Sequence, residues 1–197
     1  MKLPENNSLI CNHLGNSVKD LVDVHSFEVA HPDTGKGLEV YLKQQAFHDE
    51  CYNLMRTYLV RWKPTSECVG YFSLKAGLIS VNEKCKQEQD VFDTLPGVEI
   101  ANFAINGHFS QKYSINGLGG MLFRQLIAPF IQKHAKTLGI YMVYLFALPV
   151  PKLIKTYESY GFQRLSPQDE KLLHRRIKPV YDQSCIFMYQ LLEAIKQ

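Results

Sequence analysis

Hydrophobic and polar residues repeat along the chain with two different periods. Residues 38–50 place Leu38, Tyr41, Leu42 and Ala46 on one face of a helix. Two runs rich in aromatic and β-branched residues follow, "LMRTYLVRW" and "CVGYFSLKAGLISV". The turn-forming "KPTSE" stands between them, so the pair predicts an antiparallel hairpin.

Three segments around this hairpin lack a clear period. Near the N-terminus, "SFEV" is interpreted as a short strand and "HPDTGKG" as a loop. After the hairpin, "NEKCKQEQDVFDTLPG" is polar and is interpreted as another loop. These interpretations leave the N-terminal third of the chain with few regular elements.

The second half begins with a strand and a long helix. Residues 98–106, "VEIANFAIN", predict a strand buried on both faces, followed by a loop. Residues 117–137 predict a helix whose apolar face carries Leu118, Leu122, Leu126 and Phe130. Pro129 lies inside this helix, removes one hydrogen bond and should bend it.

The remaining elements alternate between strand and helix. "IYMVYLFALPV" predicts a buried strand, and "SCIFMYQLL" predicts the last one. Between them, "PKLIKTYESYG" fits a helix with proline in its first turn and Gly161 just past its end. The strand–helix–strand order predicts a parallel connection through the long helix. We therefore expect one domain, residues 1–197, of the α/β (α+β) class, with a mixed central sheet and flanking helices.

Composition places the chain among ordinary globular proteins. Hydrophobic residues make up 46% and charged residues 21%, and the net charge of +3 permits an acidic ligand without demanding one. The N-terminus has no long apolar segment, which predicts neither a signal peptide nor a membrane span. The five cysteines form no C-x-x-C pair, so we expect a reduced, cytoplasmic protein. The histidines show no ligand spacing either, which predicts no metal site.

A glycine step precedes the long helix. Gly117, Gly119 and Gly120 each weaken the helix start by about 1 kcal/mol relative to alanine. Glycines there allow an anion such as a diphosphate to approach the unpaired N–H groups at the positive end of the helix dipole. The same glycines could instead permit a tight turn or close packing. Neither G-x-x-x-x-G-K-[ST] nor G-x-G-x-x-G is present.

Two motifs in this order resemble the GNAT superfamily of acetyl-coenzyme A-dependent N-acetyltransferases. The first is "SINGLGGMLFRQLI", in which Gly117-Leu118-Gly119 matches the G-x-G of the family. The second is "YESYGF", residues 157–162, in which a tyrosine stands four residues before Gly-Phe. The resemblance implies a GNAT-like acyl-CoA N-acyltransferase fold with acetyl-CoA as cosubstrate.

The resemblance also implies roles for particular residues. The main chain of the glycine step would hold the diphosphate, through Ile115, Asn116, Gly117, Leu118, Gly119 and Gly120. A backbone N–H of the strand at Phe103, Ala104 or Ile105 would bind the thioester oxygen. Tyr157 would be the general acid toward the coenzyme A sulfur. Without such roles, the strand residues are core and Tyr157 is a packing tyrosine.

Within the superfamily, the chain is similar to acetyltransferase toxins of toxin–antitoxin modules. The similarity lies in "LEVYL", "RTYLVRW" and "CVGYFSLKAGLISV". It implies the amine of an aminoacyl-tRNA as one acceptor and a homodimer as one assembly. A protein lysine, a protein N-terminus or a small amine stays open. The basic run "KLLHRRIKP" could bind RNA or could be a solvated surface.

Some features depart from the family or leave a role unassigned. The family's basic or amide residue three before the first glycine is Ser114 here, and Lys112 or Gln111 could replace it. Glu99 and His108 are candidate general bases, though a structural or exposed position fits each of them better, and the amine could instead lose its proton to water. A GNAT fold that binds coenzyme A or a partner without turnover is the alternative to an enzyme.

Overall fold

The computed structural model describes residues 8–15, 17–86, 89–177 and 182–192, with side chains described outside 81–93. The chain divides into two compact units. Unit 1 consists of residues Met1–Lys75 and Ile100–Phe130, and unit 2 of residues Ala76–Glu99 and Ile131–Gln197. The chain passes between the units inside two long strands and one helix, and each unit is described by itself.

The strands form a seven-stranded mixed sheet in the order β1-β2-β3-β4-β5-β7-β6. β4 and β5 are parallel, as the connection through the long helix predicts. The β1–β2, β2–β3, β5–β7 and β6–β7 pairs are antiparallel. The strands are β1 Leu9–His13, β2 Arg56–Trp62, β3 Glu67–Lys86, β4 Gln89–Ile105, β5 Met142–Ala147, β6 Gln163–Arg164 and β7 Ile186–Leu191.

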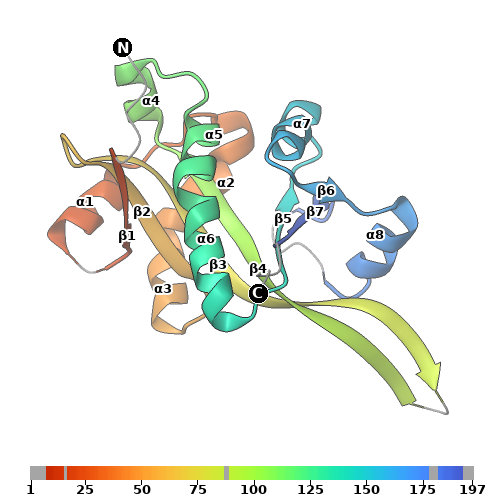
Figure 1. The fold of residues 1–197 in the computed structure, drawn as a ribbon. Coiled ribbons are helices and arrows are strands. Elements are labelled where there is room, and N and C mark those ends of the chain that lie inside the picture. Colours follow the sequence, from red (N-terminus) through yellow and green to blue (C-terminus); the bar gives the residue numbers. More distant parts are fainter. Residues whose placement is uncertain (1–7, 16, 87–88, 178–181, 193–197) are drawn as a thin grey trace. The chain divides into compact units, whose positions relative to one another are not determined.

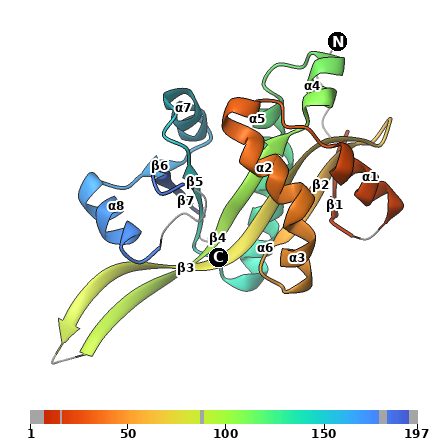
Figure 2. The ribbon, with the colours of Figure 1, turned by 180° about the vertical axis from the view of Figure 1, so that it is seen from behind.

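Helices cover both faces of the sheet in unit 1 (Figures 1 and 2). Those on one face are α1 Val18–Ser26, α2 Pro32–Gln44 and α3 Ala46–Cys51. On the other face, α5 Leu118–Leu122 continues into the π-helical turn η1 Phe123–Ile127 and then into the first residues of α6, up to Phe130; α6 as a whole is Ala128–Leu138. A short helix, α4 Gly107–Tyr113, connects β4 to α5.

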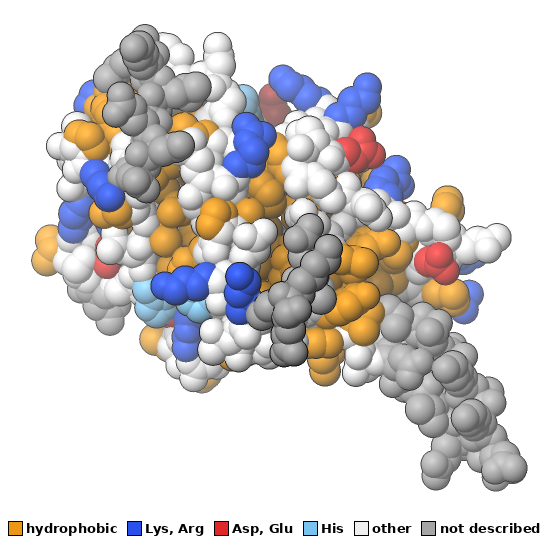
Figure 3. Space-filling view, viewed as in Figure 1, with side chains coloured by type: hydrophobic (Ala, Val, Ile, Leu, Met, Phe, Trp, Pro, Cys, Tyr) orange, Lys and Arg blue, Asp and Glu red, His pale blue; other side chains and the backbone are white. Residues whose placement is uncertain are grey.

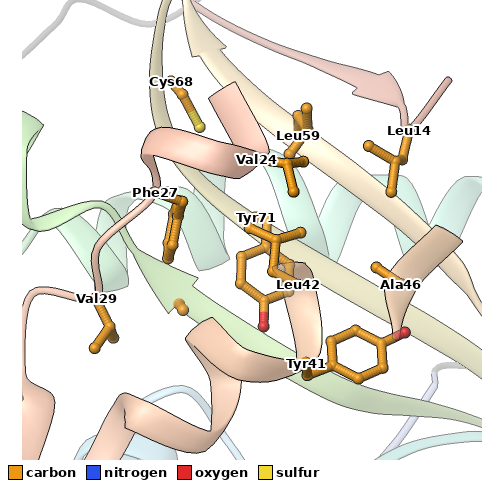
Figure 4. Packing of buried hydrophobic residues seen from close by; sticks show 11 residues of the cluster. Leu14, Val24, Phe27, Val29, Tyr41, Leu42, Ala46, Leu59, Cys68 and Tyr71 are labelled. Atoms are coloured by element: carbon orange, nitrogen blue, oxygen red, sulfur yellow. The ribbon is translucent and has the colours of Figure 1, made fainter. Parts of the chain in front are cut away.

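The core of unit 1 forms between the sheet and helices α1–α3 (Figure 4). The rings of Phe27 and Tyr71 meet edge to face at 5.4 Å between centroids. The Tyr71 hydroxyl donates to the Leu38 carbonyl at 2.6 Å, so its polar end is satisfied. The buried members are Leu14, Val24, Phe27, Val29, Tyr41, Leu42, Ala46, Leu59, Cys68, Tyr71 and Ala104.

A buried ion cluster joins α1 to β2. The Arg61 guanidinium Nη2 lies 2.6 Å from Asp20 Oδ1 and 2.7 Å from Asp23 Oδ2. Arg61 is only 5% exposed and Asp20 only 8%. Each charge is therefore compensated by its partners, and removing one would leave the others uncompensated in the interior.

Unit 2 has its own core on the β5–β7 part of the sheet. Its buried members are Ile79, Met142, Tyr144, Leu173 and Phe187. The helices of this unit are α7 Pro151–Ser159, α8 Pro167–His174 and the part of α6 from Ile131 onward. Hydrophobic side chains also reach the molecular surface (Figure 3). In unit 2 they include Leu78, Tyr141, Leu172 and Leu191, which are 45–62% exposed.

Three segments of the N-terminal half differ from the sequence-based interpretation. "HPDTGKG" is the start of α2 rather than a loop, with Pro32 in the first turn. Gly35 is glycine because an added methyl carbon would lie 2.5 Å from a Val29 side-chain carbon. "SFEV" is not a strand, since α1 ends at Ser26 and Val29 makes only a single bridge to Asn106.

The described residues of the polar segment 82–97 also form strands rather than a loop, because β3 continues to Lys86 and β4 begins at Gln89. A two-stranded extension satisfies backbone groups even where side chains are polar. The strand at 98–106 is buried on one face only. Ile100, Asn102 and Ala104 are buried, whereas the alternating residues Ala101 and Phe103 are half-buried.

The segment between β4 and α5 contains α4 rather than only a loop. Asn106 caps this helix, and its side chain accepts from the His108 N–H at 3.1 Å. In the long helix, the expected disturbance at Pro129 takes the form of η1. Pro129 cannot donate to the Gln125 carbonyl, and the N–H of Ala128 bonds Phe123, five residues back.

No helix in the described part of the chain is long and apolar enough to cross a membrane. The four cysteines in that part are free thiols, and Cys85 lies outside the described side chains. Among the same residues, no group of three His, Cys, Asp or Glu side chains could hold a metal ion.

Candidate functional site

The glycine step forms the N-terminus of α5 in unit 1. Gly117 is its N-cap, with φ +72° in the left-handed region that favours glycine. The first intrahelical bond runs from the Met121 N–H to the Gly117 carbonyl at 3.1 Å. The preceding N–H groups have no partner inside the helix, and Gly117 has no side chain that could cap them.

Gly119 marks an open side of this helix start. A methyl group added there would have only the side-chain tips of Ile105 and Phe103 as neighbours, each 3.9 Å away. An added methyl group at Gly117 would meet nothing within 4 Å. The structure thus brings Phe103 and Ile105 beside the glycine step. Close packing does not explain either glycine.

Ala104 plays a different part from its two neighbours. It is buried in the core of unit 1. Its carbonyl oxygen would lie 2.5 Å from a methyl carbon added at Gly70, so β3 and β4 approach closely only because residue 70 is glycine. The pairing of β4 with β5 runs from Gly97 to Glu99 and ends before Phe103–Ile105. Ala104 therefore belongs to the core, and only its main chain is a candidate for ligand binding.

The candidate replacements for a basic residue near the glycines are placed differently. Lys112 Nζ lies 2.5 Å from Glu67 Oε1 and 5.1 Å from the Tyr113 ring centroid. The Tyr113 hydroxyl donates to the same carboxylate at 2.5 Å. These two hydrogen bonds lower the pKa of Glu67 to about 2. Lys112 is thus paired with a carboxylate that stays ionised, while Gln111 and Ser114 are exposed.

Tyr157 lies near the end of α7 in unit 2. The Gly161 N–H donates to Glu158 O at 2.9 Å and the Phe162 N–H to Tyr157 O at 3.1 Å, which together make a Schellman motif. Gly161 has φ +92°, and Phe162 packs its ring 5.9 Å from that of Tyr157. The tyrosine, glycine and phenylalanine of "YESYGF" therefore build one helix end, which fixes the Tyr157 ring.

The hydroxyl of Tyr157 has no hydrogen-bond partner among the described residues, and the residue is half-buried. Burial, and to a lesser degree Tyr160, raises the pKa of Tyr157 to about 12. The hydroxyl is therefore protonated at neutral pH and available as a donor. Packing explains the ring, but it does not explain the unused hydroxyl.

No protein-family model matches the sequence. Solved structures do resemble the fold. One is a tyrosine-to-phenylalanine variant of KacT, with TM-score 0.63 and 16% identity, covering 94% of this chain and 96% of that one. The second is AtaT complexed with acetyl-methionyl-tRNAfMet, with TM-score 0.61 and 16% identity, covering 91% and 93%. The third is AtaTR bound with acetyl-CoA, with TM-score 0.61 and 16% identity, covering 94% of each chain.

The chain has the GNAT fold. Its mixed sheet, its parallel β4–β5 pair and its helix connection are the architecture that the two sequence motifs imply. In this GNAT fold, the G-x-G segment stands at the start of α5, the second helix after β4, and "YESYGF" ends the helix that follows β5. Identity this low shows the fold alone, so residue roles need their own evidence.

The two candidate bases have partners of their own. Glu99 accepts a hydrogen bond from the Tyr144 hydroxyl on the paired strand β5, and this contact, with burial as the larger cause, raises the pKa of Tyr144. His108 is exposed on α4 and lies 3.6 Å from Glu28, which is exposed as well. Both candidate bases are therefore engaged by other side chains in the structure.

The basic run lies at the end of α8 and beyond it. Lys171, Arg175 and Arg176 are all exposed, and Arg176 also donates to Ser80 Oγ at 2.7 Å. His174 is half-buried, with its ring 6.2 Å from that of Phe146. Lys178 lies outside the described residues. The run is therefore partly structural. The sequence does not predict that this run borders a cavity, because the other walls come from strands that are far away along the chain.

Proposed function

We propose that this chain is an acetyl-CoA-dependent N-acetyltransferase that acetylates a primary amine. The observation that carries the proposal is the open glycine face of α5. Gly119 leaves the helix start without a side chain although no close packing requires its absence, whereas the left-handed φ of Gly117 by itself favours glycine. The cost of about 1 kcal/mol per helical glycine then has a purpose, which is access for an anion. The GNAT fold around it supports a diphosphate as that anion, since AtaTR is solved with acetyl-CoA.

In this proposal the main-chain N–H groups of residues 115–120 bind the diphosphate. Charge-assisted bonds from several amides and the helix dipole act on the same group. Lys112 adds little, because Glu67 already compensates its charge. Backbone donors therefore account for the missing basic residue at Ser114. The main chain of Phe103–Ile105 would offer an N–H to the thioester oxygen, as an oxyanion-stabilising donor.

Tyr157 would act on the sulfur as a hydrogen-bond donor. Its pKa of about 12 lies well above the value of about 8.5 for an aliphatic thiol. Full proton transfer to the thiolate would therefore be uphill by about 5 kcal/mol. The hydroxyl stabilises the departing thiolate without losing its proton. The proton for the thiol would come from the amine, which becomes acidic when it attacks the carbonyl.

The amine acceptor enters as its free base in this scheme. Glu99 is engaged by Tyr144, and His108 is paired at the surface. The ammonium form of the acceptor therefore loses its proton to water before the free amine attacks. For the acceptor itself we propose the amino group of an aminoacyl-tRNA. The support is the similarity over most of the chain to AtaT, which is solved with acetyl-methionyl-tRNAfMet. A toxin of this kind would arrest growth when expressed.

The test is thiol release from acetyl-CoA in the presence of charged tRNAs, peptides with free N-termini, lysine peptides and small amines. The proposal expects release above the hydrolysis background with at least one amine, and a large loss in Tyr157→Phe. Release with charged tRNA, together with growth arrest that Tyr157→Phe relieves, supports the toxin function. Background-level release that is the same in wild type and Tyr157→Phe supports binding without turnover instead.

A further inference from the structure

Helix α4 ends four residues before the glycine step, within unit 1 (Figure 1). Its C-cap, Ser114, is a residue other than glycine in the left-handed region, at φ +49°. Such a residue keeps this conformation only where its surroundings hold it. The four residue steps from Tyr113 to Gly117 span at most about 14 Å, so the end of α4 restricts where the amides of residues 115–117 can lie. These amides are among those that the proposed function assigns to the diphosphate.

The first turn of α4 is attached to two other segments of unit 1. Asn106, its N-cap, donates from Nδ2 to the Cys68 carbonyl on β3 at 3.0 Å. The N–H of Gly107 donates to the Glu28 carbonyl, just after α1, at 2.6 Å. The start of the helix is therefore held by main-chain and cap contacts that are separate from those at its end.

Glu67 joins the last turn of α4 to the sheet. Lys112 Nζ lies 2.5 Å from its Oε1, and the Tyr113 hydroxyl donates to its Oε2 at 2.5 Å. Each carboxylate oxygen thus has its own donor, from two consecutive residues of the helix. Glu67 is the first residue of β3 and pairs with Trp62 on β2, so the carboxylate projects from the sheet rather than from a loop. The Tyr113 ring also lies 4.9 Å from that of Trp62.

We propose that Glu67 is a positioning residue for the coenzyme A diphosphate. Its carboxylate holds the end of α4, and with it the left-handed Ser114, so that the amides of residues 115–117 are in place before the ligand arrives. A loop that is already ordered binds more tightly, because less conformational entropy is lost on binding. The inference rests on the proposed function, since it concerns the same diphosphate site.

An opposite role for the same contacts would be that Glu67 withholds Lys112 from the ligand. The structure favours positioning, because the uncharged Tyr113 shares the carboxylate with Lys112, and both donors belong to the end of α4. The two roles predict opposite effects when the charge of Glu67 is removed. Positioning predicts weaker binding of the diphosphate, and withholding predicts tighter binding.

The test is calorimetric titration of the full chain and of its Glu67→Gln variant with acetyl-CoA. Glutamine has one acceptor oxygen and one donor NH₂ group, so it cannot accept from Lys112 and Tyr113 in the same way. We expect the dissociation constant to rise about three- to tenfold, the effect of one or two partly exposed hydrogen bonds. In the thiol-release assay, KM for acetyl-CoA should rise with kcat unchanged, because the substitution removes no group assigned to the thioester.

Two further variants test the location. Tyr113→Phe keeps the ring beside Trp62 and removes one donor, so it should weaken acetyl-CoA in the same direction by a smaller factor. Glu50→Gln is the matched control, because Glu50 likewise bonds two side chains, those of His13 and Arg56, but at the end of α3. It should leave the affinity for acetyl-CoA unchanged.

Amide hydrogen exchange of the ligand-free chain gives a readout that does not depend on coenzyme A. The Ser114 N–H is bonded to the Ser110 carbonyl at 2.9 Å, and in Glu67→Gln it should exchange several-fold faster. The Gly107 N–H, at the other end of α4, should keep its exchange rate.

Affinity for acetyl-CoA that is equal in wild type and Glu67→Gln, or tighter in the variant, overturns the inference and leaves the proposed function standing. An equal loss in Glu50→Gln, or a fall in kcat at unchanged KM, overturns it as well, because the effect is then not one of positioning at the diphosphate. No binding of acetyl-CoA by folded wild type overturns the proposed function, and the inference with it.

Discussion

Replacement of Gly119 by alanine separates stability from ligand binding. The added methyl group has 3.9 Å to its nearest neighbours, Ile105 and Phe103, so it fits without a shift. Alanine is also the better helix former, and the free energy of unfolding should rise by up to about 1 kcal/mol. For a chain of this length, that raises Tm by roughly 2–4 °C.

Binding of acetyl-CoA should change in the opposite direction. The methyl carbon extends about 1.5 Å from the Cα, on the open side of the helix start. A diphosphate that approaches the amides there would lose at least one charge-assisted hydrogen bond, which contributes about 1.5–3 kcal/mol. The dissociation constant should therefore rise tenfold to a hundredfold.

The assay is calorimetric titration with acetyl-CoA beside thermal unfolding of the same samples. Gly37→Ala is the matched control, because Gly37 is an exposed glycine inside α2 with nothing within 4 Å of an added methyl group. It should stabilise the protein and leave acetyl-CoA binding unchanged. Unchanged acetyl-CoA affinity in Gly119→Ala would show that the diphosphate does not approach this glycine, and the reasoning from the open face would fail.

Three further predictions concern Tyr157, Arg61 and Glu39. Tyr157→Phe keeps the ring contacts and should lower kcat about 100-fold at unchanged Tm, whereas an equal loss in the control Tyr160→Phe would refute the donor role. Arg61→Ala should lower the free energy of unfolding in urea by about 3–5 kcal/mol, because it leaves two carboxylates uncompensated. The control Arg56→Ala, at a half-exposed arginine, should lower it by at most about 1 kcal/mol. Similar losses in the two variants would contradict a stabilising role for the buried Arg61 cluster. Glu39 is bonded by Lys36, Lys43 and the Val29 N–H, which lowers its pKa to about 2, below its unfolded value of about 4.3. The ionised Glu39 carboxylate therefore contributes to folding stability above pH 4.3, and this contribution is lost as pH falls toward 2. In urea titrations, wild type should lose more stability than Glu39→Gln between pH 7 and pH 3. Equal losses in the two proteins would contradict the lowered pKa of Glu39.

Local sequence signals predicted the elements that depend on local physics. β2, β5 and β7 follow from runs of apolar residues, and the end of α7 follows from Gly161. Asn106 is a typical N-cap residue and could have predicted α4, but the segment after it was interpreted as a loop. Pro32 is likewise a typical first-turn residue of α2, but Gly35 and Gly37 in the same segment favour a loop. Glycine is ambiguous because it serves turns, close packing and ligand access alike.

Features that depend on distant contacts could not be predicted. The pairing of Lys112 with Glu67 joins residues 45 positions apart, and the burial of Arg61 depends on α1. The cavity of unit 2 likewise needs α8 and four strands together. For the candidate site, the sequence predicted roles for the glycine step and Tyr157, and these roles stay predictions. Their side-chain environments, including the open face at Gly119 and the raised pKa of Tyr157, required the structure.

The most direct measurement compares acetyl-CoA with acetyl-pantetheine, which carries the same thioester but no diphosphate, by calorimetric titration of the folded chain. Main-chain binding of the diphosphate predicts a saturable heat with acetyl-CoA and binding at least a hundredfold weaker for acetyl-pantetheine, since two or more charge-assisted hydrogen bonds are absent. Equal affinity for the two thioesters, or no heat with acetyl-CoA, would contradict the account.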